Sequence, residues 1–258
     1  MLHQQPVFFV THVPKCCGTS LHYAIRDGLA LSDSSFYWPG RVSFTRKAGM
    51  SGIFWAHPSD FDYLVGHYPW GVHRLLRPWS HVARRKRLHI ATLRDPIDQM
   101  ISYYHYHLEL GDRSPWSQFL SDNQDVVQFY LSAVPAQNLQ TKAYAGLPFT
   151  NFWIPALKVL GERKLVRIAQ NHLLKNYSYW IHHSFIESSV EHLSCGIGVP
   201  LKIARVGITA TKSRPKLTDV SEDVIQRLSM INSLDIRLHQ LLNPFFDRYC
   251  GSFADSSL

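Results

Sequence analysis

The sequence predicts a single α/β domain, spanning residues 1–258, with a central parallel sheet and a mostly helical second half. Three observations support this class. Short apolar runs alternate with helical patterns over the first hundred residues, which is typical of a parallel sheet. From about residue 115 onward the pattern is mostly helical. No internal repeat and no linker-like composition divides the 258 residues into two domains.

The first hundred residues contain three predicted strands, at 7–12, 62–66 and 87–93. A helix at 18–29 follows the first strand and opens with Gly-Thr-Ser. Another helix follows the third strand, with Pro96 at its first position and Asp95 as its N-cap. One face of this helix carries four apolar side chains at helical spacing: Ile97, Ile101, Tyr104 and Leu108.

The remaining segments follow from their periodicity. Residues 32–60 are rich in Ser, Gly, Pro and aromatic residues without a clean period, which predicts a long excursion from the sheet. Residues 179–184 predict one more strand. Helices are expected at 115–132, 135–145, 155–173 and 221–249, the last with a break near Ser233.

Composition excludes several classes of protein. Apolar residues make up 45% and charged residues 18% of the chain, which excludes a disordered chain or a coiled coil. No apolar run approaches the roughly 18 residues of a membrane span. The four cysteines show no C-x-x-C spacing, so we expect reduced thiols. Subtracting 19 acidic from 27 basic residues leaves +8, which suggests an anionic partner.

The sharpest local pattern is VFFVTHVPKCCGTSLHYAI, at residues 7–25. A strand, a tight loop and a helix start present unpaired N–H groups to an anion, and Lys15 adds a full charge. Gly18 permits close approach of the backbone. A Walker A loop would place lysine directly after its last glycine, whereas Lys15 precedes Gly18 by three residues. The alternative is an ordinary strand-to-helix turn with a surface lysine.

A second candidate anion-binding segment is IATLRDPIDQMISYY, at residues 90–104. Arg94 follows a strand, at the end where open α/β sheets bind ligands, and offers a planar fork of donors. Ser102 lies about two turns into the next helix. The alternative is a local salt bridge from Arg94 to Asp95 or Asp98, with Ser102 facing solvent.

Together the two segments resemble the cofactor signatures of the sulfotransferases that use PAPS, 3′-phosphoadenosine 5′-phosphosulfate. The similarity is closest to the branch containing the heparan sulfate 2-O-sulfotransferases and related carbohydrate sulfotransferases. Further segments match this branch in order, so the resemblance spans nearly the whole chain: DYLVGHYPWGVHRLL at 62–76, QNLQTKAYAG at 137–146, TKSRPKLTDVSEDV at 211–224 and NSLDIRL at 232–238.

The resemblance implies a role for each matching residue. A P-loop-like loop after the first strand would bind the 5′-phosphosulfate, with Lys15 also acting in catalysis; its residues are Lys15, Cys16, Cys17, Gly18, Thr19 and Ser20. Arg94 and Ser102 would bind the 3′-phosphate. Ser213 and Arg214 would belong to a segment that closes over the nucleotide. His67, in a Gly-His sequence after a strand, would be the base.

Two features depart from the family pattern. The pair Cys16-Cys17 replaces small or polar residues. These cysteines would either narrow the loop or make it sensitive to oxidation, since a helix N-terminus lowers a thiol pKa. Gln99 stands where a charged residue is common. The chemistry implied is in-line sulfuryl transfer from PAPS, leaving PAP, to a hydroxyl whose proton passes to neutral His67. We expect no metal, because no acidic cluster of magnesium type is present and Lys15 can stabilise the leaving phosphate.

The acceptor side is less defined. Candidate acceptor contacts are Trp38, Trp55, Tyr68, Trp70 and His105, the alternative being that the aromatic residues pack a long loop. The basic run at 84–87 is either a solvated turn or an attractor for a polyanion. Golgi members of the family carry an amino-terminal anchor that this sequence does not show, so the alternatives are a truncated sequence and a soluble, microbial sulfotransferase. The short start before the first strand favours the second. We therefore expect a cytoplasmic enzyme acting on a natural product or a carbohydrate, without a membrane or nucleic-acid partner.

Two other classes of function remain open from the sequence. One is a P-loop-type nucleotide kinase, against which the position of Lys15 and the lack of a magnesium carboxylate count. The other is a non-enzymatic binder of nucleic acid or another polyanion, suggested by the net charge of +8.

Overall fold

The computed structural model describes residues 6–29, 36–38, 63–71, 86–114, 116–120, 125–147, 153–203 and 214–250. Five strands form one sheet in the order β2-β3-β1-β4-β5, and every neighbouring pair is parallel. Their bounds are β1 Val7–Thr11, β2 Phe36–Trp38, β3 Tyr63–Gly66, β4 Arg87–Leu93 and β5 Tyr179–His182. The predicted parallel α/β sheet is confirmed. Strand β2 was not predicted, because it is a three-residue segment inside the aperiodic tract at 32–60.

The helices confirm the predicted helical second half. They are α1 Gly18–Gly28, α4 Pro96–Leu110, α5 Val126–Ser132, α6 Leu139–Ala145, α7 Trp153–Leu160, α8 Glu162–Asn176, α9 Ile186–Ile197, α10 Glu222–Ile231, α11 Ser233–Leu242 and α12 Phe246–Cys250. The predicted helix at 155–173 is divided by Gly161, whose φ of 75° lies in the left-handed region. Helix α9 was not predicted. The predicted break near Ser233 falls at Asn232.

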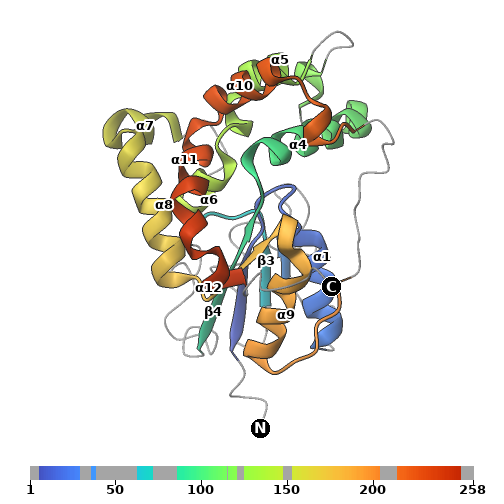
Figure 1. Ribbon diagram of the computed structural model, residues 1–258, viewed down its shortest axis with the longest axis vertical. Coiled ribbons are helices and arrows are strands. Elements are labelled where there is room, and N and C mark those ends of the chain that lie inside the picture. Colours follow the sequence, from blue (N-terminus) through green and yellow to red (C-terminus); the bar gives the residue numbers. More distant parts are fainter. Residues whose placement is uncertain are drawn as a thin grey trace.

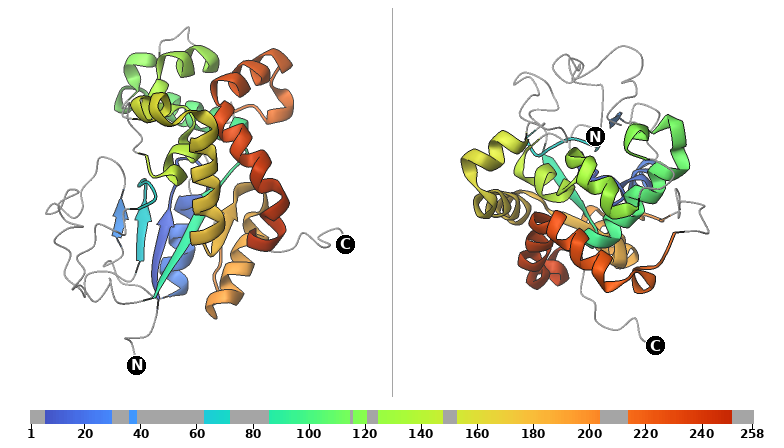
Figure 2. Two further views of the ribbon diagram at one scale, coloured as in Figure 1. Left: turned by 90° about the vertical axis from the view of Figure 1, so that its left-hand side faces the viewer. Right: turned by 90° about the horizontal axis from the view of Figure 1, so that it is seen from above.

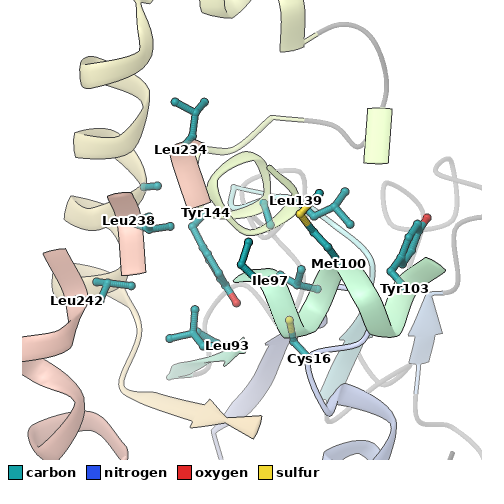
Figure 3. Packing of buried hydrophobic residues seen from close by; sticks show 14 of the residues in the cluster. Cys16, Leu93, Ile97, Met100, Tyr103, Leu139, Tyr144, Leu234, Leu238 and Leu242 are labelled. Atoms are coloured by element: carbon teal, nitrogen blue, oxygen red, sulfur yellow. The ribbon is translucent and has the colours of Figure 1, made fainter. Parts of the chain in front are cut away.

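Both faces of the sheet are covered, which explains why its strands are continuously apolar. Figure 2 shows α1 and α9 on one side of the sheet and α8 on the other. The first side buries a cluster that includes Phe8, Val10 and Leu21. The second side buries the larger cluster, with Leu93 and Trp180 from the sheet. Figure 3 shows part of the larger cluster, where side chains of α4, α6 and α11 converge above Leu93.

Strand β4 leads directly into α4, which lies with α5 and α10 beyond the carboxyl ends of the strands (Figure 1). The predicted cap is confirmed: the Asp95 carboxylate accepts hydrogen bonds from the N–H groups of Ile97 at 3.0 Å and Asp98 at 2.9 Å, and Pro96 follows the cap. The predicted apolar face of α4 is correct except at its end, where Leu108 is 40% exposed. That residue lies in the last turn of the helix.

Candidate functional site

The loop between β1 and α1, residues 12–17, is held in an unusual backbone conformation. Lys15 and Cys17 have φ angles of 64° and 58°, in the left-handed region that residues with a Cβ seldom adopt. The N–H of Cys16 donates to the carbonyl of Val13 at 3.1 Å, and the helical ladder begins with Leu21 N–H to Cys17 C=O. The N–H groups of Gly18, Thr19 and Ser20 precede that first helical bond. The helix start therefore directs backbone donors toward the loop, as anion sites require.

Gly18 is required by its contact with His12. A methyl group at Gly18 would collide with the imidazole ring of His12, which is only 4% exposed. The close approach of the helix start to the end of β1 therefore depends on the missing side chain. His12 lies within the pattern at residues 7–25 but was not singled out in the sequence, because residue types alone do not signal its packing contact with Gly18.

Lys15 lies among other cations. Its ammonium group stacks over the ring of Tyr106 on α4, 4.4 Å from the ring centroid. Burial lowers the pKa of Lys15 to about 8, with further lowering by Arg94 and Arg214, while Glu109 acts in the opposite direction. Burial, the largest cause, penalises any charge, but the two arginines that also lower this pKa would stabilise an anion bound beside Lys15.

The two loop cysteines do not match the expected reactive pair. Cys16 is fully buried beneath α4 (Figure 3), and burial raises the pKa of its thiol well above the ordinary value. Burial likewise raises the pKa of Cys17 to about 12. The expectation of low-pKa, oxidation-sensitive thiols is therefore wrong, because desolvation outweighs the helix N-terminus. Both residues shape the loop through their backbone, and Cys16 anchors it in the core.

Arg94, Asp98 and Arg214 form a compact group, here named the arginine cluster. Arg94 Nε donates to Asp98 Oδ2 at 2.6 Å, and Arg214 Nη2 donates to the other oxygen of the same carboxylate, from 116 residues away in the sequence. Burial raises the pKa of Asp98, but the two arginines outweigh it and the net pKa is lowered. The local salt bridge considered for Arg94 is therefore present. It forms with Asp98, while Asp95 caps the helix.

Arg94 joins this cluster to the β1–α1 loop. Its Nη1 donates to the Lys15 carbonyl at 2.7 Å, and its side chain is 4% exposed. Within the described ranges, Nη2 of Arg94 and Nε of Arg214 are buried without a hydrogen-bond partner. Buried guanidinium donors left over in this way are rare and point to a ligand with acceptor oxygens.

Two glutamines fix the loop against α4 and α6. Gln99 donates to the Pro14 carbonyl at 3.0 Å, and Gln140 donates to the Arg94 carbonyl at 2.8 Å and to Gln99 Oε1 at 3.2 Å. A neutral amide can donate and accept within this buried chain, whereas a charged side chain at 99 would add one more buried charge. The departure at Gln99 therefore has a structural reason in this protein.

His67 directly follows β3, whose last residue Gly66 pairs with Thr11 of β1. Nδ1 of His67 lies 2.6 Å from the carbonyl oxygen of His12, and the two imidazole rings lie 4.4 Å apart between centroids. A carbonyl oxygen only accepts, so Nδ1 is the protonated nitrogen and Nε2 is the proton acceptor of the neutral ring. Burial lowers the pKa of His67 and the bond to His12 opposes this, so the ring is neutral at pH 7.

The other predicted site residues differ in burial and in whether the structure describes them. Ser102 is buried, 1% exposed, on the helix that Arg94 precedes. Tyr68 and Trp70 are 2% and 9% exposed, and their rings pack inside the protein, which does not support the expectation that they line an acceptor cleft. Two predicted residues, Trp55 and Ser213, lie outside the described ranges, as do Arg84 and Arg85 of the basic run.

Two acceptor candidates keep positions near the site. The backbone of Trp38 pairs with Gly66, one residue before His67. His105 is half-buried on α4, where burial and then Arg214 lower its pKa. Both therefore belong to the same edge of the sheet as the β1–α1 loop.

No protein-family model matches the chain, and no curated protein matches it. Over the part of the chain that the structure describes, no helix is both long enough and apolar enough to cross a membrane. The same residues contain no group of three or more His, Cys, Asp or Glu side chains placed to hold a metal ion.

Proposed function

We propose that this chain is a PAPS-dependent O-sulfotransferase acting on a hydroxyl of a small molecule or a carbohydrate. One observation carries the proposal. Three cations from distant segments, Lys15, Arg94 and Arg214, meet at the carboxyl edge of a parallel sheet, where a neutral histidine also lies. Ligands of open α/β sheets bind at this edge.

The residues present fit an adenosine nucleotide with two phosphate-type ends. The β1–α1 loop offers backbone N–H groups and the Lys15 ammonium to one anion. The arginine cluster offers a buried guanidinium donor without a partner to a second anion. Because Arg94 contacts both Asp98 and the Lys15 carbonyl, the two anion sites are neighbours. A phosphosulfate at the loop and a 3′-phosphate at the arginine cluster match this pair.

PAPS, when bound, supplies the sulfuryl group and retains its two phosphates as PAP. Lys15, with a pKa of about 8, is mostly a cation at pH 7, and it stabilises negative charge at the loop. His67 is held by the His12 carbonyl with Nε2 unprotonated. That nitrogen takes up the proton that an acceptor hydroxyl loses. Its lowered pKa keeps it in the accepting form at neutral pH.

The direct test is a binding titration with PAP and with Mg-ATP side by side. Micromolar binding of PAP, with weaker binding of Mg-ATP, supports the proposal. Magnesium-dependent ATP turnover would instead favour a nucleotide kinase. Steeply salt-dependent binding of nucleic acid, without affinity for PAP, would favour a polyanion binder.

The role of His67 is tested in the same protein. His67→Asn keeps a side chain that can donate to the His12 carbonyl but removes the proton acceptor. We expect unchanged PAP affinity and a turnover of labelled PAPS about 10²–10⁴-fold lower, the usual contribution of a general base. A His67→Asn protein that binds PAP more weakly, but turns over normally once PAPS is bound, would contradict the role of His67 as the base.

A further inference from the structure

His183 lies beside the arginine cluster and plays no part in the proposed chemistry described so far. It follows β5 directly, and the last residue of that strand, His182, pairs with Leu93, the residue before Arg94. The carboxyl ends of β4 and β5 therefore bring His183 and Arg94 to one place. Nδ1 of His183 lies 3.9 Å from Asp98 Oδ2, the oxygen that also accepts from Arg94.

The charges facing His183 come from four segments. Arg94 precedes α4, Asp98 lies on α4, Arg214 comes from the carboxyl-terminal part of the chain, and Lys15 comes from the β1–α1 loop. Burial lowers the pKa of His183 to about 4, and Arg94 adds to this, while Asp98 opposes it. The imidazole is therefore neutral at pH 7, in surroundings with one carboxylate and three cations. Its side chain is 39% exposed, so a proton can reach it from solvent.

We propose that His183 takes up a proton from solvent when a phosphate dianion binds Arg94 and Arg214, and that its imidazolium then acts as a third cation for that phosphate. This inference rests on the proposed function, because it assigns the phosphate to the 3′ position of the nucleotide. No bond is made or broken other than the N–H bond on the imidazole.

The sign of the effect follows from the charge balance. A dianion brings almost two negative charges to a place where Asp98 alone opposes three cations. An anion within about 4–6 Å of an imidazole favours its protonated form and raises its pKa by about 1–3. From a value of about 4, this brings the pKa of His183 toward neutrality in the bound protein. Binding therefore consumes protons and tightens as the pH falls from 8 to 6.5.

Other histidines near the cluster are less suited to this role. His182 is 3% exposed, its Nδ1 accepts from the Ser184 N–H at 3.3 Å, and burial lowers its pKa to about 3. His239 packs against the His182 ring and is held by the Arg94 backbone. His105 is half-buried near Arg214, and Glu109 also faces it, so it is the best internal control.

The experiment is calorimetric titration of the intact chain with PAP at pH 6, in two buffers of different ionisation enthalpy. The wild-type chain is compared with His183→Asn, His183→Gln and His105→Asn. We expect His183→Asn and His183→Gln to lose most of the proton uptake, and His105→Asn to retain it. Proton uptake at Lys15 is the same in all four proteins, so it cancels when the variants are compared with wild type. AMP, which lacks the 3′-phosphate, should show no difference between wild type and either His183 variant.

Affinity gives a second readout. A rise in the pKa of His183 from about 4 to about 7 on binding should make the wild-type dissociation constant for PAP fall about fourfold more between pH 8 and pH 6.5 than that of His183→Asn. Unchanged proton uptake in both His183 variants would overturn this inference while leaving the proposed function intact. Loss of the uptake in His105→Asn instead would also overturn it. A chain that does not bind PAP at all would overturn both.

Discussion

The β1–α1 loop and the arginine cluster lie at the same edge of the sheet but hold their polar groups by different means. The loop depends on backbone shape: two residues in the left-handed region, a glycine against His12, and the buried thiol of Cys16 beneath α4. The cluster depends on charge balance, since one carboxylate serves two guanidinium groups that approach it from distant segments. Substitutions in the loop should therefore act through geometry, and substitutions in the cluster through charge. Lys15 lies in the loop, and its charge interacts with those of Arg94 and Arg214 in the arginine cluster.

The largest effect is expected at Lys15, where charge can be removed with little change of shape. We expect Lys15→Met to lower turnover with PAPS about 10²–10³-fold, the usual cost of removing one group that stabilises developing charge. The melting temperature should not fall, because the folded protein disfavours the charged lysine. A melting scan and an initial-rate assay check the pair of outcomes. A large fall in melting temperature would show that Lys15 supports the loop structurally.

A loop substitution tests the dependence on shape. Gly18→Ala should destabilise the protein by about 1–3 kcal/mol and weaken PAP binding, because the new methyl group meets the His12 ring. Denaturant unfolding measures the first effect and titration the second. The double variant Gly18→Ala with His12→Ala should recover part of the loss if the ring is the cause. An additive double-mutant cycle would contradict the proposed contact.

Removing the shared carboxylate tests the dependence on charge. Asp98→Asn leaves two guanidinium groups without an anion, so we expect about 2 kcal/mol lower stability. The increase in melting temperature on adding PAP should become larger than in wild type, because the phosphate then supplies the missing negative charge. Asp95→Asn, which keeps a capping side chain on the same helix, is the matched control. A smaller ligand-induced shift in Asp98→Asn would contradict the charge-balance account.

The pH dependence of stability also compares the two regions, and over one pH unit it gives the smallest expected effect. His107 lies near Lys15 and His182 near Arg94; burial lowers their pKa values to about 4 and about 3, from about 6.5 in the unfolded chain. Below pH 6.5 the unfolded chain therefore binds more protons, and stability falls as the pH falls. Each histidine contributes about 1.4 kcal/mol per pH unit between its two pKa values.

Urea unfolding between pH 7 and pH 4.5 measures that slope. His107→Gln and His182→Gln should each flatten it. An equal slope in all three proteins would place the acid sensitivity elsewhere in the chain.

Part of the site was predictable because its signals are local. The Gly-Thr-Ser helix start, the position of Lys15 and the Asp95-Pro96 cap are each set by a few consecutive residues, and the structure places them as expected. The bond between Asp98 and Arg94 was one of the two local salt bridges considered, but the second bond of Asp98, to Arg214, carried no local signal. His12 and His183 carried none either, because their contacts with Gly18 and Arg94 form only in the folded chain.

The class of fold follows from local patterns: apolar runs, helical periodicity and capping residues predict a parallel α/β sheet with a helical second half, because strand and helix preferences are local. Which charges meet and which aromatic rings are buried follows only from the folded structure. Asp98 joins two arginines, Cys16 becomes a core residue, and Tyr68 and Trp70 pack inside the protein. Burial and charge pairing depend on which segments come together, and no local pattern encodes that meeting.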